Sequence, residues 1–100
     1  MAITQTLEKY PSESRMYDFN FANLLEGDDL VSDVDSIEEE VESGTESDGL
    51  TVGDGSVNGD VVTVRISEGT AGVTYKITCT VTTSKDNTLT IVGFLKVLSE

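Results

Sequence analysis

The sequence contains no histidine and no tryptophan, and it has a single cysteine and a single proline. Without histidine, the chain lacks the side chain that most often serves as a general base and as a transition-metal ligand. One cysteine cannot form an internal disulfide, which excludes the disulfide-stapled class of small secreted domains. These absences argue against an enzyme and against a fold that depends on disulfides or a transition metal.

Positive charge is also scarce, with six Lys and Arg against 19 Asp and Glu and a formal net charge of -13. Each contact with a nucleic-acid phosphate needs a basic side chain, so we expect no nucleic-acid partner. No apolar run approaches the ~20 residues that cross a bilayer, and residues 1–13 lack the apolar core of a secretory signal. We therefore expect no membrane partner. The 100 residues, 37% of them apolar, suffice for one domain with a core.

The acidic residues are unevenly distributed. Residues 1–50 carry 14 of the 19 acids and two of the six bases, and residues 26–48 hold eleven acids with no base. Such a run is usually a solvated, self-repelling edge or loop. The repulsion is tolerable if a basic neighbour neutralises the acids or if the segment faces water. We favour the second, because an outward acidic face keeps assemblies apart and soluble.

The second half of the chain has the clearest periodicity. Residues 61–67 and 75–82 alternate apolar with polar side chains, which is typical of half-buried antiparallel strands. Leu89 and Ile91 resume the alternation after a polar turn at residues 84–87. Gly93 then interrupts it, which predicts a bulge, a bend or a strand covered on both faces.

Shorter signals predict the remaining strands. Residues 15–21 alternate aromatic with polar side chains, and residues 50–53 form a short apolar run. Asn58-Gly59 lies between two valine-bearing runs, which is a strong hairpin signal. Pro11 disfavours regular pairing nearby, so residues 1–13 are interpreted as an extended arm.

The segment from Leu30 to Val41 gives conflicting signals. Leu30, Val34, Ile37 and Val41 are spaced as on one face of an amphipathic helix. However, the valines and serines between them are poor helix formers, and the acids continue to the end where the helix dipole disfavours them. The pattern alone slightly favours a helix.

No cofactor or metal is predicted. Calcium is the ion that the acids around Asp28, Asp29, Asp33 and Asp35 suggest, but this stretch lacks the glycine and closing glutamate of a calcium loop at the right offset. Paired carboxylates are plentiful, yet a small sandwich without tryptophan rarely offers the cleft of a glycosidase. Cys79 lies mid-strand on the apolar face and is interpreted as core filler.

One local stretch resembles immunoglobulin-like and fibronectin-type sandwiches. Gly69-Thr70-Ala71-Gly72-Val73-Thr74-Tyr75 is similar to the turn that enters a core strand in those domains. The resemblance implies that the hydroxyl of Tyr75 bonds back across this corner. Ile77 takes the place of the cysteine of true immunoglobulin domains, so their disulfide is absent here.

A longer resemblance covers most of the chain. It is carried by the order of Lys9-Tyr10-Pro11-Ser12-Glu13, Tyr17-Asp18-Phe19, Leu24-Leu25-Glu26-Gly27-Asp28-Asp29-Leu30, Asp48-Gly49-Leu50-Thr51-Val52-Gly53, Gly69-Thr70-Ala71-Gly72 and a threonine-rich strand at 77–83. This order is similar to small tailed-phage virion proteins of the fiber–tail adaptor or capsid decoration type. The resemblance implies a strand, not a helix, after Leu30, and we follow it there.

We therefore expect an all-β protein, an immunoglobulin-like antiparallel β-sandwich of about six or seven strands over residues 14–100, preceded by an extended arm at 1–13. The expected core side chains are Phe19, Phe21, Val62, Val64, Ile66, Tyr75, Ile77, Cys79, Val81, Leu89 and Ile91.

The expected function is a non-enzymatic structural protein of the phage virion that binds other tail, fiber or capsid proteins and is homo-oligomeric in the particle. The arm would order on a neighbouring subunit by strand pairing. We expect contacts through Leu7, Tyr10, Pro11, Arg15 and Tyr17. The alternative is an acidic inhibitor or nucleic-acid mimic that binds a basic site on a host protein, which would need the acids held rigidly on one face.

Overall fold

All the regular elements of the computed structural model, which describes residues 3–47 and 49–99, are β-strands. That part of the chain contains no helix long and apolar enough to cross a membrane. The strands in chain order are β1 (Ile3–Lys9), β2 (Ser14–Asn20), β3 (Val31–Ser43), β4 (Leu50–Val52), β5 (Ser56–Asn58), β6 (Val61–Glu68), β7 (Thr74–Thr83) and β8 (Thr88–Val97).

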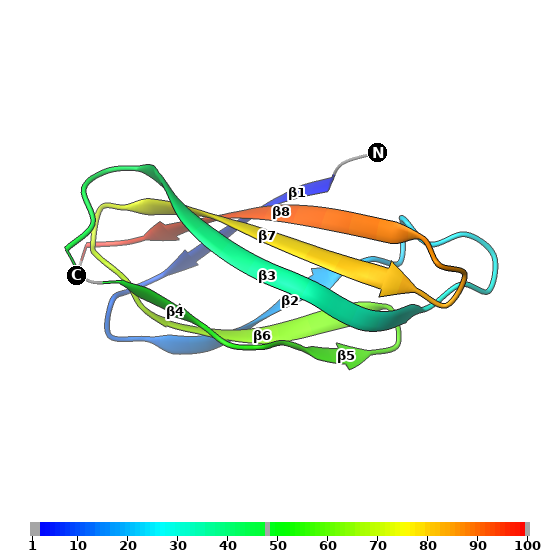
Figure 1. The fold of residues 1–100 in the computed structure, drawn as a ribbon. Helices are drawn as coiled ribbons and strands as arrows, with labels where there is room; N and C mark the ends of the chain where they lie inside the picture. The colour runs from blue at the N-terminus through cyan, green and yellow to red at the C-terminus, as the bar shows by residue number, and fades with distance from the viewer. Residues whose placement is uncertain (1–2, 48, 100) are drawn as a thin grey trace.

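The strands form two sheets that pack face to face in an elongated sandwich of 43 × 22 × 17 Å (Figure 1). One sheet has the order β1-β8-β7-β3, and the other has the order β2-β6-β4 with β5 also paired to β6. The triplets β3-β7-β8 and β2-β6-β4 correspond to the C-F-G and B-E-D strands of the immunoglobulin arrangement. The predicted all-β sandwich is confirmed, with eight strands where about six or seven were expected.

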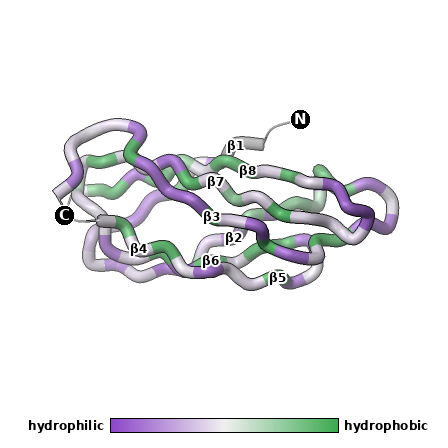
Figure 2. Tube along the Cα trace, viewed as in Figure 1, coloured by the Kyte–Doolittle hydropathy of each residue, from purple (hydrophilic) through white to green (hydrophobic). Residues whose placement is uncertain are grey.

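The core lies between the two inner faces, where the apolar segments of neighbouring strands meet (Figure 2). Ten predicted core side chains are buried, and Leu89 is partly buried against them. The core also contains six buried side chains that were not predicted, namely Tyr17, Val31, Leu50, Val73, Leu95 and Val97. Strict alternation along β7 places one row of its side chains in this core, which is why the prediction succeeded for that strand. In β8 it succeeded only up to Ile91, because an interruption was expected at Gly93.

The segment after Leu30 is the long strand β3. The strand implied by the resemblance is confirmed, and the helix favoured by the spacing of the apolar residues is wrong. The register with β7 explains the misleading spacing. Val31, Val34 and Ile37 lie opposite Thr83, Val81 and Cys79. Each step of three residues along β3 therefore corresponds to a step of two residues along β7. An extra residue in each interval is the mark of a β-bulge, and it returns the next apolar side chain to the inner face.

The expectation of a separate arm at residues 1–13 is corrected for the described part of that segment. Residues 3–9 form β1, which pairs in parallel with β8 from Ile3–Ile91 to Lys9–Val97. Leu7 packs against the core, and Lys9 is 1% exposed. Backbone pairing and this burial make the segment part of the sandwich. The β1–β8 pair is also an exception to the predicted antiparallel arrangement.

Gly93 does not interrupt β8, because the pairing with β7 runs without a shift from Thr88 to Lys96. Gly93 is buried on the same face as Ile91 and Leu95. A Cβ atom there would lie 3.2 Å from a ring carbon of Phe19 on the opposite sheet. Of the three alternatives given for Gly93, the bulge is therefore wrong, and the glycine makes room for an aromatic ring.

The hairpin expected at Asn58-Gly59 is present, displaced by one residue. Asn58 pairs with Val61, so the two-residue loop is Gly59-Asp60, with Gly59 at a φ of 68°. A glycine with positive φ at the first loop position suits the twist of a two-residue hairpin.

Candidate functional site

The turn between β1 and β2, residues 10–13, is called the Tyr10 turn below. It lies at the end of the sandwich where β1 stops and β2 starts (Figure 1). Pro11 follows Tyr10, and the backbone N–H of Glu13 donates to the carbonyl of Tyr10 at 3.0 Å. Proline is favoured at this second position because its φ is already that of the turn. The side chain of Glu13 also accepts from the N–H of Tyr10 at 2.7 Å.

The buried side chain of Lys9 holds the Tyr10 turn in place through hydrogen bonds. Its ammonium group donates to the carbonyls of Tyr10 at 2.7 Å, Pro11 at 3.4 Å and Glu68 at 2.5 Å. The last of these joins the turn to the end of β6. The carbonyl of Lys9 accepts from the N–H of Leu98 at 2.8 Å. The turn is thus a rigid platform tied to both sheets, not a free segment.

The five predicted contact residues fall into two groups. Tyr10, which is 42% exposed, and Arg15 present their side chains to solvent, and Pro11 is half-buried beside them. Leu7 and Tyr17 instead pack into the core, because each lies on the inward row of its strand. The structure thus brings Tyr10, Pro11 and Arg15 to one end of the molecule and uses the other two as support.

Tyr17 joins the two sheets at this end. Its hydroxyl donates to the carbonyl of Glu8 at 2.7 Å. The guanidinium of Arg15 lies 5.7 Å from the centre of the Tyr17 ring, within the range of a cation–π contact. Burial raises the pKa of Tyr17, an effect that Arg15 opposes and Glu13 reinforces. The phenol therefore stays protonated and keeps donating at neutral pH.

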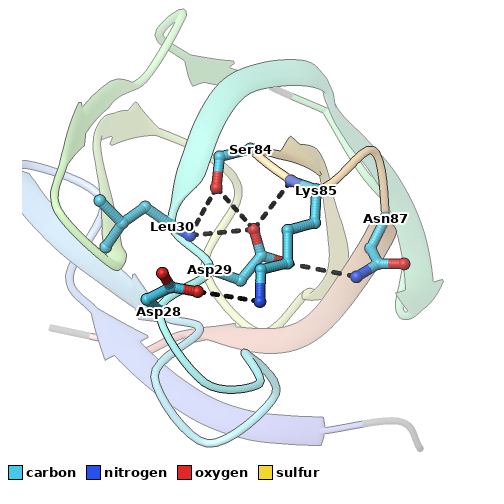
Figure 3. A network of polar contacts seen from close by, with 6 residues as sticks. All are labelled: Asp28, Asp29, Leu30, Ser84, Lys85 and Asn87. Carbon is cyan, nitrogen blue, oxygen red and sulfur yellow. Dashed lines mark hydrogen bonds and ion pairs between the residues drawn. The ribbon is translucent and has the colours of Figure 1, made fainter.

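A second polar cluster surrounds Asp29 (Figure 3). It lies next to the β7–β8 hairpin, at the end of the sandwich opposite the Tyr10 turn (Figure 1). One carboxylate oxygen of Asp29 accepts from the N–H of Leu30 at 3.0 Å, the hydroxyl of Ser84 at 2.7 Å and the N–H of Lys85 at 3.0 Å. The other oxygen accepts from the side chain of Asn87 at 3.3 Å. Residues 29–30 and the β7–β8 hairpin are thereby held together across 55 residues of sequence.

Burial by itself would raise the pKa of Asp29, which is 4% exposed. Hydrogen bonds from Thr83, Ser84, Lys85 and Asn87 stabilise the ionised form more strongly, and they lower the pKa from 3.8 to about 2. The carboxylate is therefore a structural acceptor that joins two loops. The neighbouring Asp28 is largely exposed and pairs with Lys85 at 2.9 Å.

Acid should weaken the fold through Asp29. Because its folded pKa is below the ordinary value, its contribution is fully present above about pH 4 and is lost as the pH falls towards 2. We expect Asp29→Asn to lower the free energy of unfolding at pH 7 and to reduce this difference from wild type as the pH drops to 2. Urea unfolding at several pH values measures both effects.

The matched control is Asp28→Asn, because Asp28 is adjacent but exposed. This variant should follow the wild-type pH profile closely. An Asp29→Asn difference that stays constant from pH 7 to pH 2 would show that the carboxylate charge does not hold the two loops together.

The corner between β6 and β7 has the contact that the immunoglobulin resemblance implied. The N–H of Thr70 donates to the hydroxyl oxygen of Tyr75 at 3.1 Å. Burial raises the pKa of Tyr75. The hydroxyl of Thr70 accepts from the N–H of Ser47 at 3.0 Å, which fastens the β3–β4 loop to the same corner.

Cys79 is fully buried, and burial raises the pKa of its thiol to about 11. A thiol with this pKa stays protonated and unreactive at neutral pH, in agreement with its interpretation as core filler. In the described residues, no three acidic or cysteine side chains are grouped closely enough to hold a metal ion.

The chain was compared with protein families, curated proteins and solved structures. Residues 9–94 match the family model of the podophage GP4 fiber-tail adaptor protein gp77. The chain belongs to this family. No curated protein and no solved structure matches it. The family membership assigns the chain a structural role and places it in the phage virion, as the resemblance implied.

The family match extends over the Tyr10 turn, the Asp29 cluster and the Tyr75 corner, and it omits most of β1. In the sequence, Asp29 is one acid of a long run that suggests calcium at most, and Lys9 is a single isolated base. Neither has a local signal that distinguishes it from a solvated charge. Their partners in space, Glu68 and Ser84, lie 59 and 55 residues away along the chain.

Proposed function

We propose that this chain is a non-enzymatic adaptor that binds other tail, fiber or capsid proteins of the particle, in several copies, without contacting nucleic acid or membrane. Its contacts with a neighbouring virion protein are made at the Tyr10 turn, by Tyr10 and Pro11, and at the start of β2, by Arg15. The proposal retains three of the five predicted contact residues. It replaces the free arm with a preformed turn.

The rigidity of the Tyr10 turn carries this proposal. Tyr10 is 42% exposed, yet its backbone is held by Glu13 and Lys9. An exposed aromatic on a fixed backbone loses little conformational entropy on binding. Tyrosine and arginine are also the residue types that contribute most at protein interfaces. Arg15, already positioned over Tyr17, adds the second such side chain.

The rival hypothesis, a nucleic-acid mimic, receives no support from the placement of the acids. Glu38, Glu39 and Glu40 are consecutive in a regular stretch of β3, so their side chains alternate between the two faces of the sheet. A mimic of a phosphate backbone needs such charges on one face. The family match favours a virion component over a soluble inhibitor.

The proposal is tested by complementing a phage that lacks the gene with the double variant Tyr10→Ala, Arg15→Ala. Both side chains are exposed, so the variant should fold and unfold like wild type. We expect its amount in purified particles to fall about tenfold or more, as the loss of two interface anchors implies. Quantitative mass spectrometry of the particles measures this amount.

Met16→Ala is the matched control, because Met16 is 50% exposed on the outer face of β2 close to the same end. It should enter particles normally. If the double variant is incorporated as well as Met16→Ala, the contacts lie elsewhere on the sandwich. If the wild-type chain is absent from particles, the adaptor function itself is wrong.

A further inference from the structure

The two long sides of the sandwich differ. On the side of β1 and β2, side chains bridge the sheets, because Gln5 donates to the carbonyl of Asp18 at 3.0 Å and Tyr17 donates to that of Glu8. On the other side, β3 is the last strand of its sheet, and β4 and β5 lie at the edge of theirs (Figure 1). The second side is where a further chain can approach the backbone.

A groove of about 330 Å³ lies between β3 and the β4–β5 edge. Val34, Ile37 and Val52 contribute apolar side chains to it, and Asp35 and Asp54 contribute acidic ones. Gly55 allows Ile37 to lie there, since a Cβ atom at position 55 would be 2.7 Å from Cδ1 of Ile37. The groove is thus lined by both apolar and acidic side chains.

The free edge of β3 beside this groove is regular over residues 36–41. Ser36 to Val41 pair one for one with Thr80 to Tyr75, between the bulge at residue 35 and the irregularity at residue 42. Six regular residues match the usual length of a strand. In variable-type immunoglobulin domains an additional strand lies beside the equivalent C strand, so the architecture accommodates one here.

The charge of this edge determines which chain can occupy it. Glu38 and Glu40 lie on the outer face, Glu39 lies on the inner face, and all three are exposed. In the described residues, Lys76 is the cation paired with this stretch, at 3.8 Å from Glu40. Like charges directly opposite each other destabilise strand pairing, so a second copy of this edge is disfavoured. Lysine or arginine opposite the same positions is favoured.

We propose that a basic, extended segment of another virion protein adds to this edge as a fifth strand, paired along residues 36–41. Its Lys or Arg side chains lie opposite Glu38 and Glu40, and its apolar side chains pack on Ile37 and the groove. Backbone hydrogen bonds provide affinity, and alternating side chains provide specificity. The acids of β3 are then contact residues, which replaces the expectation that they only face water. The inference rests on the proposed adaptor function and adds the chemistry of a second partner.

The first test uses the full chain and a short synthetic peptide in which lysine and valine alternate. Isothermal titration calorimetry measures affinity, and backbone amide NMR shifts locate the site. We expect shifts centred on residues 36–41 and binding that weakens at high salt. The variant Glu38→Gln, Glu40→Gln should bind about tenfold more weakly, as expected for two opposite-charge cross-strand pairs.

Two controls make the result specific. A peptide with glutamate in place of lysine should not bind. The variant Glu26→Gln, Asp86→Asn removes the same charge from exposed positions away from β3 and should leave the affinity unchanged. No binding of the lysine peptide, equal weakening in both variants, or shifts spread over the surface would overturn the proposal.

The second test measures incorporation of Glu38→Gln, Glu40→Gln into particles. We expect this variant to remain attached through the Tyr10 turn while the second partner is reduced in the particle. Particles with a normal protein inventory would show that the acids merely face water. That outcome refutes the edge proposal but leaves the proposed adaptor function intact. The adaptor function is refuted only if the wild-type chain is missing from particles.

Discussion

Replacing Ile77 with aspartate is expected to unfold the domain. Ile77 is fully buried in the middle of β7, with Glu39 and Gly93 opposite it on the two neighbouring strands. The change removes about 1.5–3 kcal/mol of apolar burial and places a carboxylate among the buried apolar side chains of the inner face. Domains of this size have a stability of about 5–15 kcal/mol. Circular dichroism and amide NMR dispersion should show loss of the native state at 25 °C.

The control for this variant is Thr74→Asp. Thr74 lies on the outer row of the same strand and pairs with the exposed Lys96 of β8, so a carboxylate there faces solvent and a cation. It should leave the unfolding midpoint nearly unchanged. A folded Ile77→Asp protein with native chemical-shift dispersion would mean that the inner face of β7 is not the core.

The same alternation explains why this part of the fold was predictable. From Tyr75 to Val81 each second side chain is buried, and the polar row between them is threonine or lysine. When one face of a strand is buried, the alternation of apolar and polar residues in its own sequence shows which side chains point into the core. The hydrogen bond at the Tyr75 corner could also be expected from the sequence, because the turn glycines and the tyrosine lie within a few residues of each other.

The spacing of β3 misled for a physical reason. Two bulges insert residues between Val31, Val34 and Ile37, so apolar side chains recur after three residues in an extended chain. That spacing imitates a helix face, and the residues of β3 alone cannot distinguish the two. The pairing with β7 decides between them, because ten residues of β3 have a partner in β7 along one edge of the strand.

The strand β1 was unpredictable for a different reason. Its partner β8 lies 88 residues away in sequence, as Ile3 opposite Ile91 shows. A parallel pair between distant segments leaves no turn signal in the sequence. Pro11 predicts little regular pairing nearby, but it occupies the turn that lets β1 and β2 belong to different sheets.

Replacing Lys9 with methionine should cause the second large effect. Methionine keeps the length and the apolar stem of the side chain, so the packing volume is nearly conserved. It removes the donors to the carbonyls of Tyr10, Pro11 and Glu68. Hydrogen bonds from a charged donor contribute about 1.5–3 kcal/mol each. Because the bond to Pro11 is long at 3.4 Å, we count the other two and expect a loss of about 3–6 kcal/mol in the free energy of unfolding. Urea titration followed by tyrosine fluorescence measures it.

The same variant distinguishes the local stability of the Tyr10 turn from the global stability of the fold. Under conditions where Lys9→Met is still folded, the N–H of Glu13 should exchange with solvent faster, because the Tyr10 turn has lost its anchor. The amides of β7 should be protected in proportion to global stability alone. Lys96→Met removes an exposed ammonium from β8 and should change neither quantity. If Lys9→Met unfolds no more readily than Lys96→Met, the buried ammonium does not hold the turn, and the rigidity on which the Tyr10 contact depends must have another origin.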